Sequence, residues 1–293
     1  MSIFHFLLVL SFFFKIYFVN QTLETSMVSD LQAYLLEKIS DLPDELSESS
    51  GIILYDSLLW SFNDSGGEPE IYGVDRTSGM ILKTIEISNG NNKDWEDIAQ
   101  NQDYIFIGDF GNNDGSRKDL RIYMIPKKSI KNQEHQSTDA LMIDFSYEDQ
   151  EDFTPAMFAN QYDCEAMIAT SDSLYLFTKD WLNLQTSIYS LPSSSGKFKA
   201  KHIGDFESEG LVTGADHDYK GNKIVLCGYS LFYPFIVVIN NIVDLKVLKR
   251  IEFEEISGLQ IEGIAFIQEN KFYITNENSS EPQALYRIIL KSF

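Results

Sequence analysis

The sequence is poor in cysteine and histidine, which argues against several kinds of site. It has two cysteines and four histidines in 293 residues. Cys164 and Cys227 do not form a CxxC pair, and the histidines are scattered, so the spacing predicts no zinc or copper centre. The two cysteines could form one disulfide, but their positions do not decide it. No GxSxG, HExxH or phosphate-binding loop motif occurs, so those enzyme classes are not indicated.

Basic residues are also scarce. The chain has 23 Lys and Arg against 44 Asp and Glu, and its formal net charge is −21. Binding to a nucleic-acid backbone requires a basic face, so no nucleic-acid partner is expected. A soluble protein that holds divalent cations fits this acidity. The hydrophobic content of 44% and aromatic content of 13% are enough for a folded core.

No apolar run in the sequence is long enough to span a bilayer by itself. The longest, Ile3–Phe14, has the length of a signal-peptide core, although Lys15 follows the run and no basic residue precedes it. Residues 1–21 are therefore predicted to be a signal peptide, or an uncleaved anchor that extends through Phe18. The expected location is secreted, periplasmic or at the cell surface, and residues 22–293 are predicted to form one domain.

An internal repeat organises the rest of the chain. Five segments share one order of parts: a short small-residue or acidic start, a strand, a polar loop, and further strands of five to eight residues with alternating character. The starts are SSGI at Ser50, EDIA at Glu96, EAMI at Glu165, EGLV at Glu209 and EGIA at Glu262. The long interval before Glu165 indicates an insertion, assigned to the acidic residues 148–159.

The fifth segment ends after three strands, because the chain stops at Phe293. The stretch AYLLEKISDL, residues 33–42, precedes the first segment and can supply the missing strand, although a short helix over residues 29–36 competes with it. The predicted fold is all-β, a five-bladed β-propeller of four-stranded antiparallel blades. An N-terminal strand in the last blade closes it, which removes open sheet edges.

The repeat predicts a ring of polar side chains. The first strand of each propeller blade lines the central channel, so equivalent start positions face one another. Several carboxylates on one axis cannot all stay ionised without a partner, so either their pKa values rise or a cation binds among them. Ca²⁺ is the expected cofactor, since it takes six to eight oxygen ligands in irregular geometry. The alternative is that backbone amides and channel water satisfy the carboxylates. The predicted metal ligands are Ser50, Glu96, Glu165, Glu209 and Glu262.

Loops that follow the second strands should crown the same end of the channel, because the first two strands of a blade are antiparallel. Their polar and aromatic residues are the predicted ligand-binding set: Asn63, Asp64, Asp109, Asn112, Lys179, Trp181 and Asn276. Ordinary turn chemistry is the competing explanation for the Asn and Asp residues. Asp109 directly follows a strand and is the candidate catalytic residue. Asp94, Asp97 and Asp163 flank the ring and could support the ligands or add to them.

The five starts resemble the inner-strand motifs of calcium-centred propellers, namely the soluble calcium-activated nucleotidases (apyrases) and the phytase-like secreted proteins. The resemblance covers the layout of residues 45–293 and only short motifs. It implies five blades around one calcium ion, with Glu209 standing where a serine is expected. The basic and aromatic nucleotide-binding segments of apyrases are missing, so the resemblance implies the fold more strongly than the activity.

The function predicted from the sequence is that of an exported, monomeric calcium-binding propeller. A small molecule, a glycan or a protein would bind at the channel mouth. A calcium-dependent phosphohydrolase, in which Asp109 orients water, is one alternative. A scaffold in which the cation only ties the blades together is another.

Overall fold

The computed structural model describes residues 33–218 and 223–291. The predicted signal or anchor segment, residues 1–21, lies outside the described residues. The elements below belong to one compact unit, Leu35–Phe293, apart from the first residue of the first strand. They are strands and three short 3-10 helices, at Asp44–Leu46, Lys127–Ser129 and Glu254–Ile256. Within the described ranges, no helix has the length and apolarity to cross a membrane.

The strands form antiparallel sheets that follow the repeat. The first sheet contains β2 (Ser49–Tyr55), β3 (Leu58–Asn63), β4 (Glu70–Asp75) and β5 (Ile81–Ile87). The next two runs are β6 (Trp95–Gln100), β7 (Tyr104–Asp109), β8 (Arg121–Pro126) and β10 (Leu141–Tyr147), then β11 (Asp163–Ala169), β12 (Ser173–Lys179), β13 (Thr186–Pro192) and β14 (Gly196–Phe206). The fourth is β15 (Leu211–His217), β16 (Ile224–Ser230), β17 (Tyr233–Ile239) and β18 (Val247–Glu252).

The last sheet joins the two ends of the described chain. It contains β19 (Ile261–Gln268), β20 (Lys271–Asn276) and β21 (Ala284–Leu290), and β1 (Tyr34–Asp41) lies beside β21. Residues that were candidates for a short helix, from Tyr34 onward, are therefore strand. The side chain of Gln283 donates from Nε2 to the carbonyl oxygens of Leu42 and Pro43, at 3.2 and 3.0 Å. The segment after β1 is thus fastened to the chain just before β21.

Burial explains the difference between inner and outer strands. Every residue of β11 and β15 is buried, as expected for strands covered on both faces. In β14, by contrast, exposed Lys197, Lys199 and Lys201 alternate with more buried residues such as Ala200. The core fills the space between neighbouring sheets. Phe62 and Trp95, for example, meet edge to face with ring centroids 5.5 Å apart.

Two parallel pairings were not predicted from the sequence. β9 (His135–Thr138) comes from the long connection after β8 and pairs in parallel with β5 of the preceding sheet. β10 pairs in parallel with β14, so two repeat units share one eight-stranded sheet. The predicted acidic insertion, residues 148–159, contains no strand.

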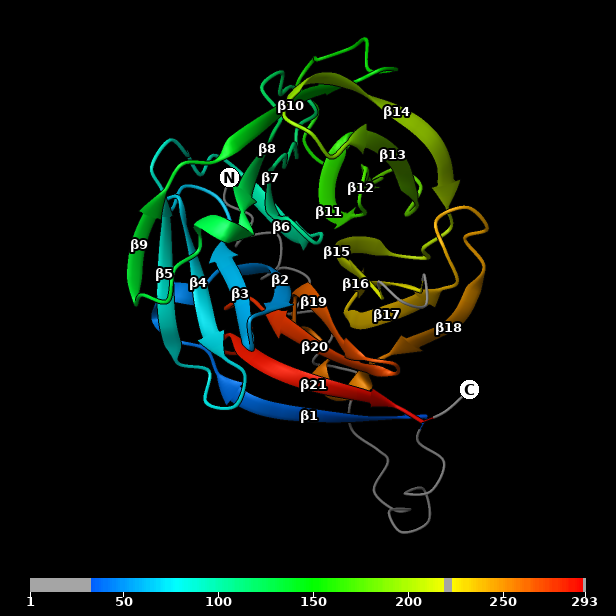
Figure 1. Ribbon diagram of the computed structural model, residues 1–293. Helices are drawn as coiled ribbons and strands as arrows, with labels where there is room; N and C mark the ends of the chain where they lie inside the picture. The colour runs from blue at the N-terminus through cyan, green and yellow to red at the C-terminus, as the bar shows by residue number, and fades with distance from the viewer. Residues whose placement is uncertain (1–32, 219–222, 292–293) are drawn as a thin grey trace, which may run out of the picture. The chain divides into compact units, whose positions relative to one another are not determined.

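The first strands of the repeat units contact one another in a cyclic order, which runs β2, β6, β11, β15, β19 and back to β2. Figure 1 shows each of these strands at the inner end of its run of strands, with β5, β14 and β18 farther out. Sheets that radiate from a ring of first strands are the arrangement of a β-propeller. The start of each first strand and the end of each second strand lie at the same end of this ring, because the two strands are antiparallel.

Candidate functional site

The predicted ring positions lie on irregularities of the first strands. In four of these strands one residue is skipped in the pairing with the second strand: Glu96, Glu165, Thr213 and Glu262. In β2 the register shifts directly after Ser50. A β-bulge re-aims the side chain of the extra residue and is frequent beside functional sites. The shared bulge makes Glu96, Glu165, Thr213 and Glu262 equivalent, whereas Ser50 is paired with Phe62 and lies just before the irregularity of β2.

Glu209 is not in this group, so the predicted alignment of the fourth unit needs correction. It precedes β15, has a backbone φ of 54°, and its side chain is 78% exposed, 3.9 Å from Arg250. The prediction aligned EGLV, which begins at Glu209, with EGIA, which begins at Glu262, because the two motifs have similar sequences. In the structure, the equivalent of Glu262 lies four residues after Glu209. Thr213 holds that place and was not predicted from the sequence.

The two hydroxyls of the ring connect neighbouring strands. Ser50 Oγ donates to the main-chain carbonyl oxygen of Glu96 at 2.5 Å, and Thr213 Oγ1 donates to that of Ile261 at 2.5 Å. Both hydroxyls are buried. Their hydrogen is therefore used within the protein, and each one ties a first strand to the next one in the cycle.

Lys179, at the end of β12, forms a buried ion pair with Glu165. Its Nζ lies 2.9 Å from Oε2 of Glu165, and the two side chains are 6% and 4% exposed. Burial alone would lower the pKa of Lys179, but the charges of Glu165 and Glu262 outweigh it and hold that pKa well above its usual value. Burial raises the pKa of Glu262 to about 8, which Lys179 opposes. This side of the ring already contains a cation, the ammonium of Lys179.

A second acidic group lies beside Glu96. One carboxylate oxygen each from Asp64, Asp94 and Glu96 lie within 4.8 Å of one another. We call these three residues the acidic triad. Asp64 follows β3, Asp94 precedes β6, and Glu96 is on β6. Oδ1 of Asp64 is buried and accepts no hydrogen bond. Two oxygens on opposite sides of a Ca²⁺ ion stand about 5 Å apart, so the triad has the spacing and chemistry to hold a metal ion.

The pKa values of all three triad carboxyl groups are raised. Burial and the neighbouring Asp94 raise the pKa of Asp64 to about 7. Burial raises the pKa of Asp94 to about 6, although Arg117 opposes the rise. The pKa of Glu96 also lies well above its usual value, because of burial and the charges of Glu165 and Asp64. Near neutral pH the triad therefore needs either protons or a cation.

The loops around the triad are built to hold it. The Asn92 side chain donates from Nδ2 to the carbonyl oxygens of Asn63 and Asp64, at 2.9 and 2.5 Å. Gly111 passes so close that a Cβ there would lie 2.2 Å from Oε1 of Glu96 and 2.5 Å from Oδ2 of Asp94. Only glycine permits this approach. Neither Gly111 nor Asn92 was predicted from the sequence.

The carboxylate of Asp109 is engaged by other groups of the protein. Its Oδ1 lies 2.8 Å from a guanidinium nitrogen of Arg117 and also accepts from the main-chain N–H of Asp94, at 3.2 Å. Arg117 donates further to the carbonyl oxygen of Gly111 at 2.8 Å. Asp109 thus holds the main chain at Asp94 through one hydrogen bond and Arg117 through another.

The three predicted asparagines all hold loops. Oδ1 of Asn63 accepts from the N–H of Glu48. The side chain of Asn112 donates to the carbonyl oxygen of Tyr162. Oδ1 of buried Asn276 accepts from the N–H of Ala284. Hydrogen bonds to other segments of the chain, rather than local turn chemistry, therefore engage all three side chains.

The flanking aspartates Asp97 and Asp163 also have structural partners. Asp97 accepts from the N–H of Met167 at 2.7 Å, and Asp163 accepts from the N–H of Asn112 and the indole of Trp181, both at 2.8 Å. Trp181 is half-buried, and its ring packs on that of Phe158 with centroids 4.7 Å apart. Trp181 therefore joins the insertion to the channel mouth.

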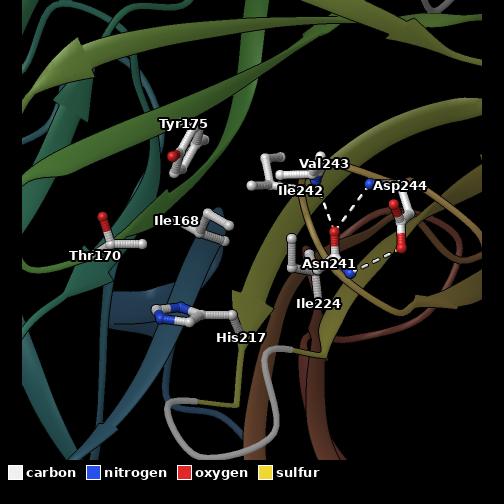
Figure 2. A pocket seen from close by; sticks show the side chains of 9 residues that line it. All are labelled: Ile168, Thr170, Tyr175, His217, Ile224, Asn241, Ile242, Val243 and Asp244. Carbon is white, nitrogen blue, oxygen red and sulfur yellow. Dashed lines mark hydrogen bonds between the residues drawn. The ribbon is translucent and has the colours of Figure 1, made fainter.

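A separate pocket of about 450 Å³ lies at the other ends of β11 and β15. Figure 2 shows Ile168, Ile224 and Ile242 among its lining residues. The side chain of Asn241 is engaged within its own loop, by the N–H groups of Val243 and Asp244 and by the carboxylate of Asp244. The pocket is therefore mainly apolar and contains none of the predicted site residues.

Comparisons with known proteins support the fold alone. No protein family matches the sequence, and no curated protein matches it. A glucose dehydrogenase structure matches with a TM-score of 0.51 and 6% identity over 88% of this chain and all of that chain. The PQQ-bound aldose sugar dehydrogenase from Streptomyces coelicolor matches with a TM-score of 0.49 and 10% identity over 88% and 98%. The similarity to the glucose dehydrogenase structure agrees with a β-propeller, and the resemblance to calcium-activated nucleotidases stays a prediction.

Proposed function

We propose that this protein is a calcium-binding β-propeller that holds the ion in the acidic triad and binds a ligand at the same channel mouth. The observation that carries the proposal is the convergence of three carboxylates, one of which, Asp64, has a buried oxygen, Oδ1, without a hydrogen-bond partner. A buried carboxylate oxygen without a donor is costly, and a cation would remove that cost.

The finer description of the fold belongs to the same proposal. The cyclic contacts of β2, β6, β11, β15 and β19 support five blades. The position of β1 beside β21 supports closure by an N-terminal strand. In this arrangement the triad joins the first two blades, with Asp64 and Asp94 beside the ring residue Glu96. The proposed calcium ligands are thus one ring residue and two loop residues, rather than the five predicted ring positions.

Calcium suits the triad better than a transition metal. All three side chains offer carboxylate oxygens, which are hard ligands, and neither cysteine nor histidine belongs to the group. Three carboxylates leave several of the six to eight coordination positions for water or for oxygens of a bound ligand. The aromatic pair of Trp181 and half-exposed Phe158 on this end of the ring suits stacking against a sugar or another flat ligand.

Binding fits the geometry better than phosphate hydrolysis does. The predicted catalyst Asp109 accepts hydrogen bonds from Arg117 and from the main chain of Asp94. An aspartate held in this way has little freedom to orient an attacking water. The charge of Arg117 is likewise used by aspartates of the protein, which leaves little of it to neutralise a reacting phosphate.

Thermal unfolding of the full chain tests calcium binding. After treatment with EDTA, added Ca²⁺ should raise the melting temperature, since a ligand at 100 times its Kd stabilises the native state by about 2.7 kcal/mol. Asp64→Asn should abolish most of the rise. Glu209→Gln is the matched control, because this exposed carboxylate lies outside the triad. An equal rise in the wild type and in Asp64→Asn would refute the triad as the binding site.

A further inference from the structure

Lys179 occupies an unusual place for a lysine. Its ammonium lies among the ring carboxylates, 2.9 Å from Oε2 of Glu165, and its side chain is only 6% exposed. The rings of Trp181 and Tyr229 flank it, with their centroids 5.1 and 5.8 Å from Nζ. Aromatic faces attract cations, so these two rings and the carboxylate form a cation-binding environment.

Glu262 contributes to the same environment. Its carboxyl group interacts electrostatically with Lys179 and with Glu165, which places the two carboxyl groups and the ammonium in one electrostatic group. Both carboxylates are aimed by bulges in their strands, in the same way as Glu96. The group thus has the ligand chemistry expected at the centre of the ring, and the protein's own side chain supplies the cation.

We propose that the half of the ring formed by Glu165 and Glu262 is a cation site whose resident cation is the Lys179 ammonium, and that removing this ammonium turns the half-ring into a metal site. Lys179 therefore excludes a metal ion from the centre of the ring. This inference goes beyond calcium binding at the triad and does not depend on it.

The physical reason is competition for buried carboxylates. A tethered ammonium is always present at a high effective concentration, so a free ion must displace it before it can bind. Without the ammonium, the buried carboxyl group of Glu165 and the partly buried one of Glu262 remain, and they need a positive charge, protons or both. Oxygen ligands in irregular geometry then favour a hard cation such as Ca²⁺.

The test is the number of Ca²⁺ ions bound per chain, measured by equilibrium dialysis of the full protein after removal of metal. Lys179→Met keeps the length of the side chain and removes its charge, and it should bind one ion more than the wild type. Lys127→Met is the matched control, because Lys127 is also partly buried but donates to Gln100 and Asn101. The control should bind as many ions as the wild type.

The result separates this inference from calcium binding at the triad. A wild type that binds no ion would refute calcium binding at the triad, while one ion in Lys179→Met would still support the cation exchange. A folded Lys179→Met that binds no additional ion would overturn the inference.

A second measurement applies if Lys179→Met is unstable. Calcium should then raise its melting temperature more than that of the wild type, because the ion replaces the lost charge. The double variant Lys179→Met/Glu165→Gln should lose this extra rise, since one of the two carboxylates is gone. If calcium stabilises the single variant no more than the double variant, the proposed second site does not exist.

Discussion

Gly111 shows how a residue without a side chain can define a binding site. Its main chain runs directly against the carboxylates of Glu96 and Asp94. An added methyl group would have to displace one of them, because neither oxygen can share its space with carbon. The space left by Gly111 is therefore part of the site, although no sequence motif for metal binding contains it.

Gly111→Ala should weaken calcium binding by moving the triad apart. We expect a large loss of the calcium-induced rise in melting temperature, measured by thermal unfolding with and without EDTA. Gly67→Ala is the matched control, since an added Cβ there would meet its nearest side-chain atom at 3.6 Å. A calcium response in Gly111→Ala equal to that of the control would show that the triad does not bind the ion.

Single residues also show where sequence analysis succeeded and failed. Glu96, Glu165 and Glu262 were identified because a repeated acidic start precedes an apolar strand each time. Thr213 was missed because a nearby Glu-Gly pair matched the pattern better than the true position did. Which residue occupies the bulge depends on pairing with β16, and a single sequence does not contain this information.

Among the elements, β1 pairs with the strand that is most distant from it in the sequence. It lies beside β21, and Gln283 fastens the residues after β1 with two hydrogen bonds to main-chain oxygens. Contacts between such distant segments carry a loop-closure cost that the packing of the last sheet must offset. Gln283 is buried, so its amide cannot be replaced by water without rearrangement.

Gln283→Ala should destabilise the protein by about 1–3 kcal/mol, because two carbonyl oxygens lose a buried donor. Chemical denaturation monitored by tryptophan fluorescence measures this change. Gln268→Ala, at an exposed position in β19, should change the free energy of unfolding by about 0.5 kcal/mol or less. Equal effects of the two substitutions would argue against a role for Gln283 in holding the ends together.

Most strands could be predicted because their alternation and turn residues are local properties. β9 was not predicted, since its four residues, His135–Thr138, are polar and form a strand only by pairing with β5. The acidic triad was hidden for a similar reason. Asp64, Asp94 and Glu96 were each named, but they come from two repeat units and meet only in the folded protein.

At the scale of the whole molecule, the buried carboxylates make stability depend on pH. The pKa values of Asp64 and Asp94 are raised to about 7 and 6, so the metal-free folded state retains their protons more strongly than the unfolded state does. Their contribution to stability is complete below pH 4 and is lost as the pH rises to about 7. Calcium should offset this loss, because it binds the ionised form.

We therefore expect the stabilisation by calcium to grow between pH 5 and pH 7. Urea denaturation at several pH values, with EDTA or with calcium, measures it as the difference in the free energy of unfolding. Asp64→Asn should flatten this dependence, since one of the titrating groups is gone. A calcium effect that stays constant across this range would contradict the proposed linkage between proton release and metal binding.

The parallel pairing of β10 with β14 has a consequence for how the protein opens. The repeat units that begin at β6 and β11 are joined both at their first strands and at their outer edges. They therefore cannot separate from each other without breaking the pairing of β10 with β14. No described strand pair joins the outer edges at three other junctions: between the sheets that begin at β11 and β15, at β15 and β19, and at β19 and β2. Transient opening should therefore start at these junctions, and backbone amides there should exchange with solvent before those of β10 and β14.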